Sequence, residues 1–197
     1  MEVSFIIYYD FESILLPVQG AENNPDKSST RKVQEHVPCG VAYKVVCAVD
    51  TSLSRPIKLY CGTNPALWLL KNLINEVDAI MMLLVRRMKI KTLTIKQETE
   101  FASANVCHIC EQVFTPSPGP QDLVKDHCHV TGKYRSPAHD KCNLKYTAPD
   151  FVPVVAHNFH GYVSHIIVTA FGNEDITNYL NISNNDKIKC IPNNTEK

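Results

Sequence analysis

The hydrophobic pattern opens with a β-rich apolar run at residues 2–9, which has the composition and length of a buried strand. Two carboxylates, Asp10 and Glu12, come at its end. Because residues i and i+2 of a strand point to the same face, these carboxylates are expected to stand side by side. Such a pair is most often a solvated strand end. It is also how two-metal nucleases begin, since paired carboxylates hold the divalent ions that clamp a phosphodiester.

The next apolar segments predict a hairpin followed by a long helix. Two β-rich runs, at residues 40–49 and 56–60, flank a turn-like stretch. Thr63 or Asn64 can cap a helix that opens with Pro65 at its first position. We expect this helix to pack on the core, because one of its faces carries an apolar stripe. The stripe consists of Leu67, Leu70, Leu73, Ile74, Val77, Ile80 and Met81.

The remaining pattern is interrupted by a block rich in cysteine and histidine. Residues 18–36 are typical of a loop, and residues 91–104 are weakly patterned. After the block, the pattern predicts a buried strand, an apolar helix and a last short strand, at residues 151–156, 162–171 and 187–191.

With the block removed, the order β, β, β, α, β, α, β is that of a ribonuclease-H-like α/β sheet. We therefore expect one α/β domain, made of residues 1–100 and 149–197, with a metal-binding insert at residues 101–148.

Composition indicates the size of the core, the surface charge and the location of the protein in the cell. The 197 residues are 44% hydrophobic, enough for a sizeable core, and the formal net charge is zero, so any basic surface must be local. Asp10 and Glu12 interrupt the first apolar segment, which argues against a signal peptide. The longest uninterrupted apolar run, residues 79–85, is far too short to cross a bilayer. We expect a soluble intracellular protein whose cysteines bind metal.

Four residues of the block are spaced as two chelating pairs. A two-residue gap lets one tight turn place both side chains on the same ion, and this gap separates Cys107 from Cys110 and His139 from Cys142. Thiolate and imidazole are the ligands that zinc takes in closed tetrahedral sites. The sequence thus predicts a structural Cys3His zinc site. Cys128 is the competing fourth ligand, and His139 is preferred because it completes a second pair.

A second constellation fills the spacer between the two pairs. Asp126 and His127, a turn containing Gly132 and a helix beginning near Pro137 form the pattern of a β-hairpin followed by a helix. In a ββα metal nuclease, one carboxylate and one amide hold a hard ion, here Asp126 and Asn143, and a histidine removes a proton from water.

On this interpretation His127 is the base, Mg²⁺ is the catalytic ion, and Lys133 and Arg135 face the phosphates. The alternative is that these residues only brace the zinc site. The residues alone leave both interpretations open.

The order of these motifs resembles a known module. The pattern CxxC…DHCHVTGKYR…HDKCN is similar to the HNH module of the recombination endonuclease VII type. The family has a glycine after the arginine, where this chain has Ser136.

The flanking segments carry a second resemblance. YYDFES at residues 8–13, EHVPCGVAY at 35–43, HNFHGYVSHII at 157–167 and CIPNNTEK at 190–197 resemble the exonuclease region of family-B DNA polymerases encoded by Polinton/Maverick transposons. In that family an HNH-like zinc insert sits inside the 3′–5′ exonuclease domain. The resemblance implies that Asp10 and Glu12 match the first exonuclease motif, and that Asn158 and Tyr162 match the second and contact DNA.

Departures from the polymerase pattern set the functional expectation. Val163 stands where the second motif has an aspartate, and neither the third motif nor a polymerase palm occurs within the 197 residues. Because two-metal cleavage needs about four carboxylates, we expect the exonuclease site to be inactive and the sheet to be incomplete.

The expected protein is a nuclear DNA-processing fragment with metal-dependent nicking by the insert, and no small-molecule substrate is apparent. The alternative is a catalytically silent, zinc-stabilised DNA-binding or interaction module left by a transposon.

Overall fold

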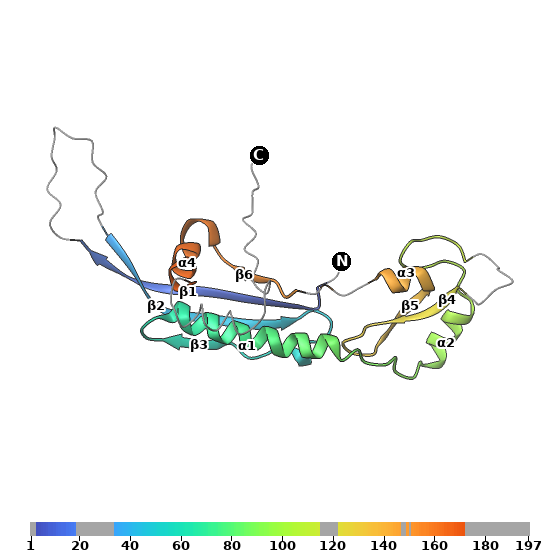
Figure 1. Cartoon of the computed structure of the whole chain (residues 1–197). Helices are drawn as coiled ribbons and strands as arrows, with labels where there is room; N and C mark the ends of the chain where they lie inside the picture. Colours follow the sequence, from blue (N-terminus) through green and yellow to red (C-terminus); the bar gives the residue numbers. More distant parts are fainter. Residues whose placement is uncertain (1–2, 19–33, 115–121, 147–148, 150, 172–197) are drawn as a thin grey trace, which may run out of the picture. The chain divides into compact units, whose positions relative to one another are not determined.

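The computed structural model describes residues 3–18, 34–114, 122–146, 149 and 151–171 (Figure 1). Most of the predicted loop and the predicted last strand lie outside them. The chain divides into two compact units, each described by itself. The sheet unit comprises Ile7–Val46, Ser54–Glu76 and Pro153–Lys197. The hairpin unit comprises Met1–Ile6, Cys47–Leu53 and Val77–Val152.

A four-stranded sheet with the order β3-β2-β1-β6 defines the sheet unit (Figure 1). Its strands are β1 (Phe5–Pro17), β2 (Gln34–Cys47), β3 (Lys58–Cys61) and β6 (Val154–Ala156). β2 and β3 pair antiparallel, which confirms the predicted hairpin, and β6 runs parallel to β1 with Tyr9 opposite Ala156. The mixed α/β architecture is therefore as expected.

The first strand is longer than its apolar segment indicated. Along β1 the odd-numbered residues from 5 to 11 are buried and the even-numbered residues from 8 to 12 are exposed. Asp10 and Glu12 therefore share the exposed face, as predicted. The prediction that they mark the end of the strand was wrong, because pairing in the sheet carries β1 on to Pro17. The polar positions interrupt only one face, so they do not end the strand.

One helix, α1 (Pro65–Val85), begins at the predicted proline. In the sheet unit, its Trp68 ring stacks on Tyr60 at 5.0 Å between centroids and tilts against Tyr43 at 5.9 Å. The first half of α1 is thus fixed on β2 and β3. Leu69, Leu70, Leu73 and Ile74 are buried there, and Leu69 lay outside the predicted stripe.

Glu76 is a buried acid on α1, only 2% exposed. Its Oε1 accepts hydrogen bonds from the Tyr43 hydroxyl at 3.0 Å and from Lys58 Nζ at 2.9 Å, and its Oε2 pairs with Arg55. Burial, and then the nearby negative charge of Glu76, raise the pKa of Tyr43, which Lys58 partly opposes. A buried carboxylate is stable only when it is paired in this way.

A left-handed residue introduces the last described helix of the sheet unit. Asn158 has φ 49°, a single π-helical turn follows at Phe159–Val163, and α4 covers Ser164–Phe171. The predicted helix at residues 162–171 is confirmed, and the π-helical turn extends it at its start. Such turns often occur at functional sites because they re-aim side chains.

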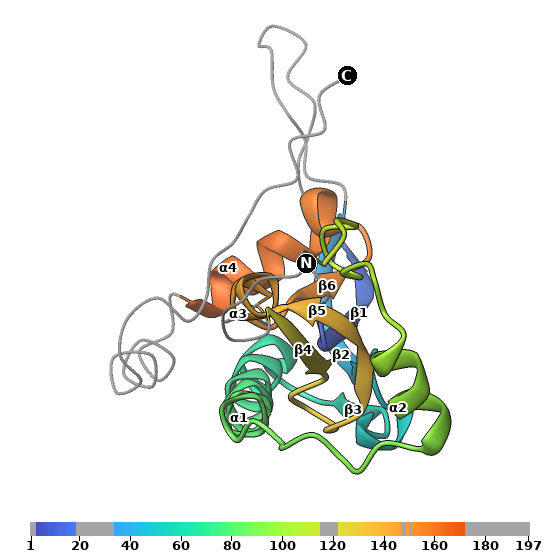
Figure 2. The same cartoon turned by 90° about the vertical axis from the view of Figure 1, so that its right-hand side faces the viewer.

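In the hairpin unit, the second half of α1 is followed by a two-stranded ribbon with a helix on each side (Figures 1 and 2). Its elements are α2 (Ile95–Ala102), β4 (Leu123–His127), β5 (Tyr134–His139) and α3 (Asp140–Lys145). The hairpin-then-helix prediction is confirmed. The predicted start near Pro137 was wrong, since Pro137 lies in β5 opposite Lys125 and α3 begins at Asp140.

Helix α2 is absent from the predicted elements. It buries no residue, so it has no apolar stripe to detect. A capping box forms it instead: Thr94 accepts from the N–H of Gln97, and the Gln97 side chain accepts from the N–H of Thr94. No helix in the described part of the chain has the length and apolar character needed to span a membrane.

Candidate metal centre and adjoining polar cluster

Four side chains in the hairpin unit converge on one point. The ligand atoms of Cys107, Cys110, His139 and Cys142 all lie within 4.8 Å of one another. His139 Nδ1 is 3.4 Å from Cys110 Sγ and 3.9 Å from Cys142 Sγ. A tetrahedral zinc with Zn–S of about 2.3 Å and Zn–N of about 2.0 Å separates sulfur from nitrogen by about 3.5 Å. The Cys3His cluster therefore fits a zinc ion, with His139 rather than Cys128 as its fourth member.

Local backbone geometry explains how the first pair forms. The N–H of Glu111 donates to the Cys107 carbonyl at 2.9 Å, and Glu111 adopts φ 60° to close the turn. The N–H of His108 donates to the Pro137 carbonyl at 3.1 Å, which docks the turn on β5. The second pair spans the start of α3, with His139 at its N-cap position. The first pair thus sits on a tight turn and the second on the first turn of α3, so that each pair can chelate one ion.

Electrostatics at the cluster favour a bound cation. Burial alone would raise the pKa of the Cys107 thiol, but the backbone N–H groups of Cys110, His139 and Ile109 outweigh it and lower this pKa to about 6. Burial and the neighbouring sulfurs of Cys110 and Cys107 raise the pKa of Cys142 to about 11. One sulfur is therefore prepared as a thiolate, while its neighbour ionises only if a positive charge arrives.

A carboxylate lies behind the His139 imidazole, on the side away from the cluster. Asp122 Oδ2 lies 3.9 Å from His139 Nε2, the ring nitrogen that faces away from the sulfurs. Metal-bound histidines commonly place such a carboxylate behind the ring, because it fixes the ring orientation and makes the other nitrogen more basic.

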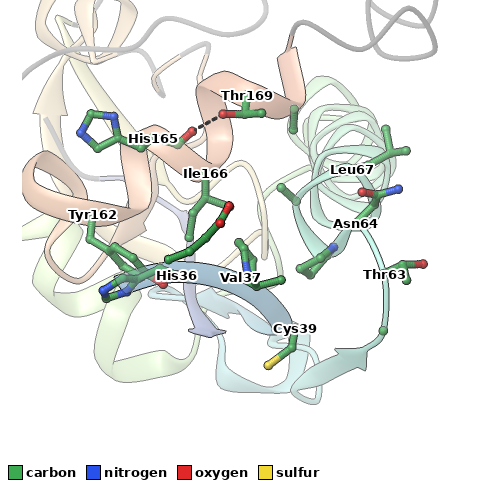
Figure 3. Close-up of a pocket in the computed structure, with 16 residues that line it drawn as sticks. His36, Val37, Cys39, Thr63, Asn64, Leu67, Tyr162, His165, Ile166 and Thr169 are labelled. Atoms are coloured by element: carbon green, nitrogen blue, oxygen red, sulfur yellow. Dashed lines mark hydrogen bonds between the residues drawn. The ribbon is translucent and has the colours of Figure 1, made fainter. Parts of the chain in front are cut away.

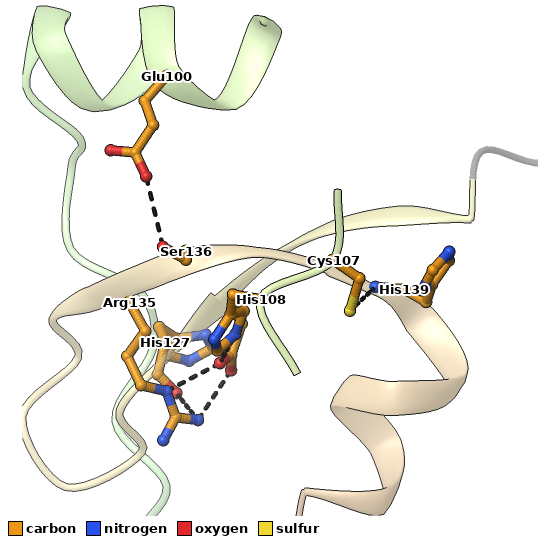
Figure 4. Close-up of polar contacts among 8 residues, drawn as sticks. Glu100, Cys107, His108, His127, Arg135, Ser136 and His139 are labelled. Atoms are coloured by element: carbon orange, nitrogen blue, oxygen red, sulfur yellow. Dashed lines mark hydrogen bonds and ion pairs between the residues drawn. The ribbon is translucent and has the colours of Figure 1, made fainter. Parts of the chain in front are cut away.

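Asp126 is the centre of a second polar cluster, whose members His108 and Arg135 are labelled in Figure 4. Its side chain is fully buried. Oδ2 accepts from Arg135 Nε at 2.9 Å and lies 2.8 Å from His108 Nε2, and Oδ1 accepts from Arg135 Nη2 at 2.8 Å. Burial would lower the pKa of Arg135, but Asp126 outweighs it and raises this pKa. Both carboxylate oxygens are therefore engaged by a bidentate arginine and an imidazole.

An irregularity in the hairpin aims Arg135 at this acid. The register passes from Asp126 opposite Ser136 to His127 opposite Tyr134, so Arg135 is the extra residue of a β-bulge. A bulge turns one side chain out of the normal alternation. The Arg135 guanidinium also donates to the His127 carbonyl at 3.0 Å and lies 4.4 Å from the centre of the Tyr146 ring.

His127 and His129 form a pair at the end of β4. Their ring centroids are 4.7 Å apart, and His127 Nε2 lies 3.2 Å from the Met88 carbonyl oxygen. Because a carbonyl can only accept, Nε2 of a neutral His127 carries the proton and Nδ1 keeps its lone pair. Burial, followed by the charges of His127, Arg87 and Arg135, lowers the pKa of His129, which Asp126 partly opposes. Asn143, half-buried on α3, is adjacent in sequence to the metal-cluster residue Cys142.

The turn of the hairpin is tied to the segment that follows α1. The N–H of Met88 donates to the His129 carbonyl at 2.7 Å, and the N–H of Lys91 donates to the Gly132 carbonyl at 2.8 Å. Exposed cations are thereby gathered beside His127 and His129, and together they form what we call the basic strip. The basic strip consists of Arg87, Lys89, Lys91 and Lys133.

Gly132→Ala is expected to destabilise the hairpin unit by roughly 1–3 kcal/mol, because it adds strain in the left-handed region and a backbone collision. Gly132 has φ +71°, and a Cβ there would lie 2.4 Å from the Lys89 carbonyl oxygen. Gly40→Ala is the control, since its Cβ would meet nothing closer than 3.5 Å. Urea unfolding of both variants checks this, and equal midpoints would show that the turn is not under this constraint.

The residues matched to exonuclease motifs lie in the sheet unit. Asp10 lies in a cleft of about 510 Å³ that Lys44 and His157 also line. Tyr162 instead lines a cleft of about 980 Å³ between β2, the start of α1 and α4 (Figure 3). Its ring lies 5.1 Å from that of His36, and its hydroxyl donates to Ser13. Asp10 and Tyr162 therefore line different clefts.

Two members of the Asp126 cluster were not predicted from the sequence. His108 lies between the cysteines of the first pair, and Tyr146 follows α3. Neither residue stands at a diagnostic spacing in the sequence. The contact of His108 with the cluster depends on how the Cys107–Cys110 turn docks on β5, and that of Tyr146 depends on the bulge at Arg135. Of the basic strip, only Lys133 was predicted to face the phosphates, since the other three members come from a segment far from it in the chain.

Comparison with known proteins identifies one part of the chain. The chain matches no curated protein and no solved structure. A model of the recombination endonuclease VII family matches residues 84–155, the stretch that contains both clusters and the basic strip. The match and the geometry together support an endonuclease VII-like module at residues 84–155, with a Cys3His cluster whose ligand atoms suit a metal ion such as zinc.

Proposed function

We propose that the module at residues 84–155 binds DNA and nicks one strand by metal-dependent hydrolysis. The observation that carries this proposal is the placement of the basic strip beside His127. Exposed lysine and arginine bind DNA phosphates through charge, without reading sequence. The strip is local, which is compatible with a formal net charge of zero for the whole chain.

His127 is the proposed general base. Its Nε2 is held by the Met88 carbonyl, which leaves Nδ1 to take a proton from water. The water oxygen then bonds to phosphorus, the bond to the sugar oxygen breaks, and that oxygen takes up a proton. Lys133 of the basic strip is the proposed contact to the phosphate during this reaction.

Asp126 and Asn143 are the proposed ligands of a divalent ion such as Mg²⁺. A carboxylate and an amide oxygen are the donors that hard cations prefer, so the donor chemistry fits. When bound, the ion supplies positive charge that offsets the charge developing on the phosphate. A zinc ion held by the Cys3His cluster would have a separate, structural role, because its four protein ligands would leave no open position for a substrate.

His127→Ala is expected to lower nicking of supercoiled plasmid in Mg²⁺ by about 10²–10⁴-fold, the usual contribution of general acid–base catalysis. Its zinc content should not change, because His127 is not a member of the Cys3His cluster. His165→Ala, at an exposed histidine on α4, is the control. Gel analysis of plasmid forms, together with zinc content, checks this expectation. Equal nicking by the two variants would remove His127 from the mechanism.

A silent, zinc-stabilised DNA-binding module is the second candidate. The observation in its favour is that both oxygens of Asp126 are engaged by Arg135 and His108. The same plasmid assay separates the two functions. DNA binding without nicking, in a protein that holds one zinc, supports the silent module.

For the sheet unit we propose descent from a polymerase exonuclease domain of the Polinton/Maverick type, without retained exonuclease activity. The strand order β3-β2-β1-β6, with β6 parallel to β1, supports this origin. Val163 stands where the family pattern has an acid, and it is only 2% exposed. Because an apolar side chain cannot hold a cation, two-metal cleavage is not expected here. A nuclear location follows from this proposal.

A further inference from the structure

Arg135 occupies the carboxylate oxygens of Asp126 that the proposed nicking reaction needs for a divalent ion. The arginine covers both carboxylate oxygens, with Nε and Nη2 at 2.9 and 2.8 Å. Its guanidinium carries a full positive charge at any physiological pH. A divalent ion on Asp126 would stand beside that charge and would need the same lone pairs. The ion and the arginine therefore compete for one acid.

One nitrogen of the same guanidinium, Nη1, is not engaged by Asp126. Among the described residues, Nε and Nη2 make every hydrogen bond recorded for Arg135, and Nη1 donates to none. The side chain is 26% exposed. Arginine binds phosphate through two nitrogens on one edge, so it can pass from a carboxylate to a phosphate with little change of shape. Lys133 of the basic strip lies two residues away and would bring a phosphate close.

We propose that Arg135 gates Asp126, releasing it to a divalent ion when a DNA phosphate takes the arginine in exchange. This inference rests on the proposed function, because it assigns a regulation to that site. DNA and the ion then bind cooperatively, since each favours the state in which Arg135 has left Asp126. His108 stays with the acid and preserves its position through the exchange. The module therefore binds its divalent ion only while it is bound to DNA.

Mn²⁺ binding, followed by the electron paramagnetic resonance signal of the free ion, tests the gate without using activity. Every protein is the full chain with zinc bound and carries His127→Ala, so that duplex DNA remains uncut. With Arg135 intact, a duplex oligonucleotide is expected to tighten Mn²⁺ binding about tenfold, within the usual range of coupling between two sites. Arg135→Gln is expected to bind Mn²⁺ about tenfold more tightly without DNA and to lose most of the response to DNA.

Two further variants keep the test decisive. Lys133→Gln removes a nearby cation that does not touch Asp126, so it should weaken DNA binding and leave Mn²⁺ affinity without DNA within about twofold. Arg135→Lys keeps the charge but loses the bidentate contact, so its Mn²⁺ affinity should lie between those of the parent and Arg135→Gln. Zinc content reports whether each variant is folded. If Arg135→Gln loses zinc, the Mn²⁺ affinity of Arg135→Lys tests the gate in its place.

The gate and the nicking activity fail in different ways. If Mn²⁺ affinity is the same with and without Arg135, the gate is overturned, whatever the plasmid assay shows. If Mn²⁺ binding follows Arg135 and DNA as expected but the chain with His127 cuts no plasmid, nicking is overturned and the gate stands.

Discussion

Cys107→Ser is expected to abolish zinc binding and unfold the hairpin around the metal centre. Cys107 is fully buried, and its sulfur accepts the backbone N–H of His139 at 3.3 Å, so it joins the two halves of the site. Structural zinc contributes about 10–16 kcal/mol of apparent binding free energy in small zinc-dependent domains, and this is folding free energy. Serine is a far poorer zinc ligand than a thiolate. Elemental analysis and limited proteolysis of the purified chain check this expectation.

Cys128→Ser is the matched control for this experiment. Cys128 belongs to the same hairpin but not to the converging cluster, so the variant is expected to keep one zinc and its protease resistance. If Cys128→Ser lost the metal and Cys107→Ser kept it, the assignment of the ligands would be wrong.

Glu76→Ala is expected to lower the free energy of unfolding of the sheet unit by roughly 3 kcal/mol. The substitution leaves Arg55, Lys58 and the Tyr43 hydroxyl without their shared acceptor. The value lies at the low end of the range for a broken buried pair, because Arg55 and Lys58 are 33% and 46% exposed and can turn to water. Equilibrium denaturation measured by Trp68 fluorescence checks it, since Trp68 packs on the same strands.

Glu12→Ala is the control for Glu76→Ala, because Glu12 is an exposed glutamate in the same unit. It should change the free energy of unfolding by less than about 0.5 kcal/mol. A loss of under about 1 kcal/mol for Glu76→Ala would mean that this network is structurally dispensable.

The sequence predicted the parts of the fold that depend on local pattern. Pro65 marked the start of α1, and the Cys107 and His139 pairs marked the metal cluster, because both follow from spacing along one segment. The sequence did not predict α2, because this helix begins with a capping box and has no apolar stripe. The predicted start of α3 was wrong because Pro137 lies in a strand. Glu76 was not predicted as a buried acid either, since its three partners come from β2, β3 and the segment between them.

In the candidate site too, the sequence predicted the residue types but not their contacts. The types and order of Asp126, His127 and Asn143 predict their chemistry, but their partners follow from a β-bulge and a docked turn. A bulge of one residue leaves no distinctive pattern of polar and apolar positions. The pairing of Arg135 with Asp126, which changes how the site is expected to work, could therefore be found only in three dimensions.

X-ray absorption at the zinc edge of the purified full chain tests the account most directly. The account predicts one zinc per chain, with three sulfur ligands at about 2.3 Å and one nitrogen at about 2.0–2.1 Å. Four sulfurs would place Cys128 in the site instead of His139. A shell of oxygen ligands, or a folded chain that holds no zinc, would contradict the central claim that the Cys3His cluster is a structural zinc site.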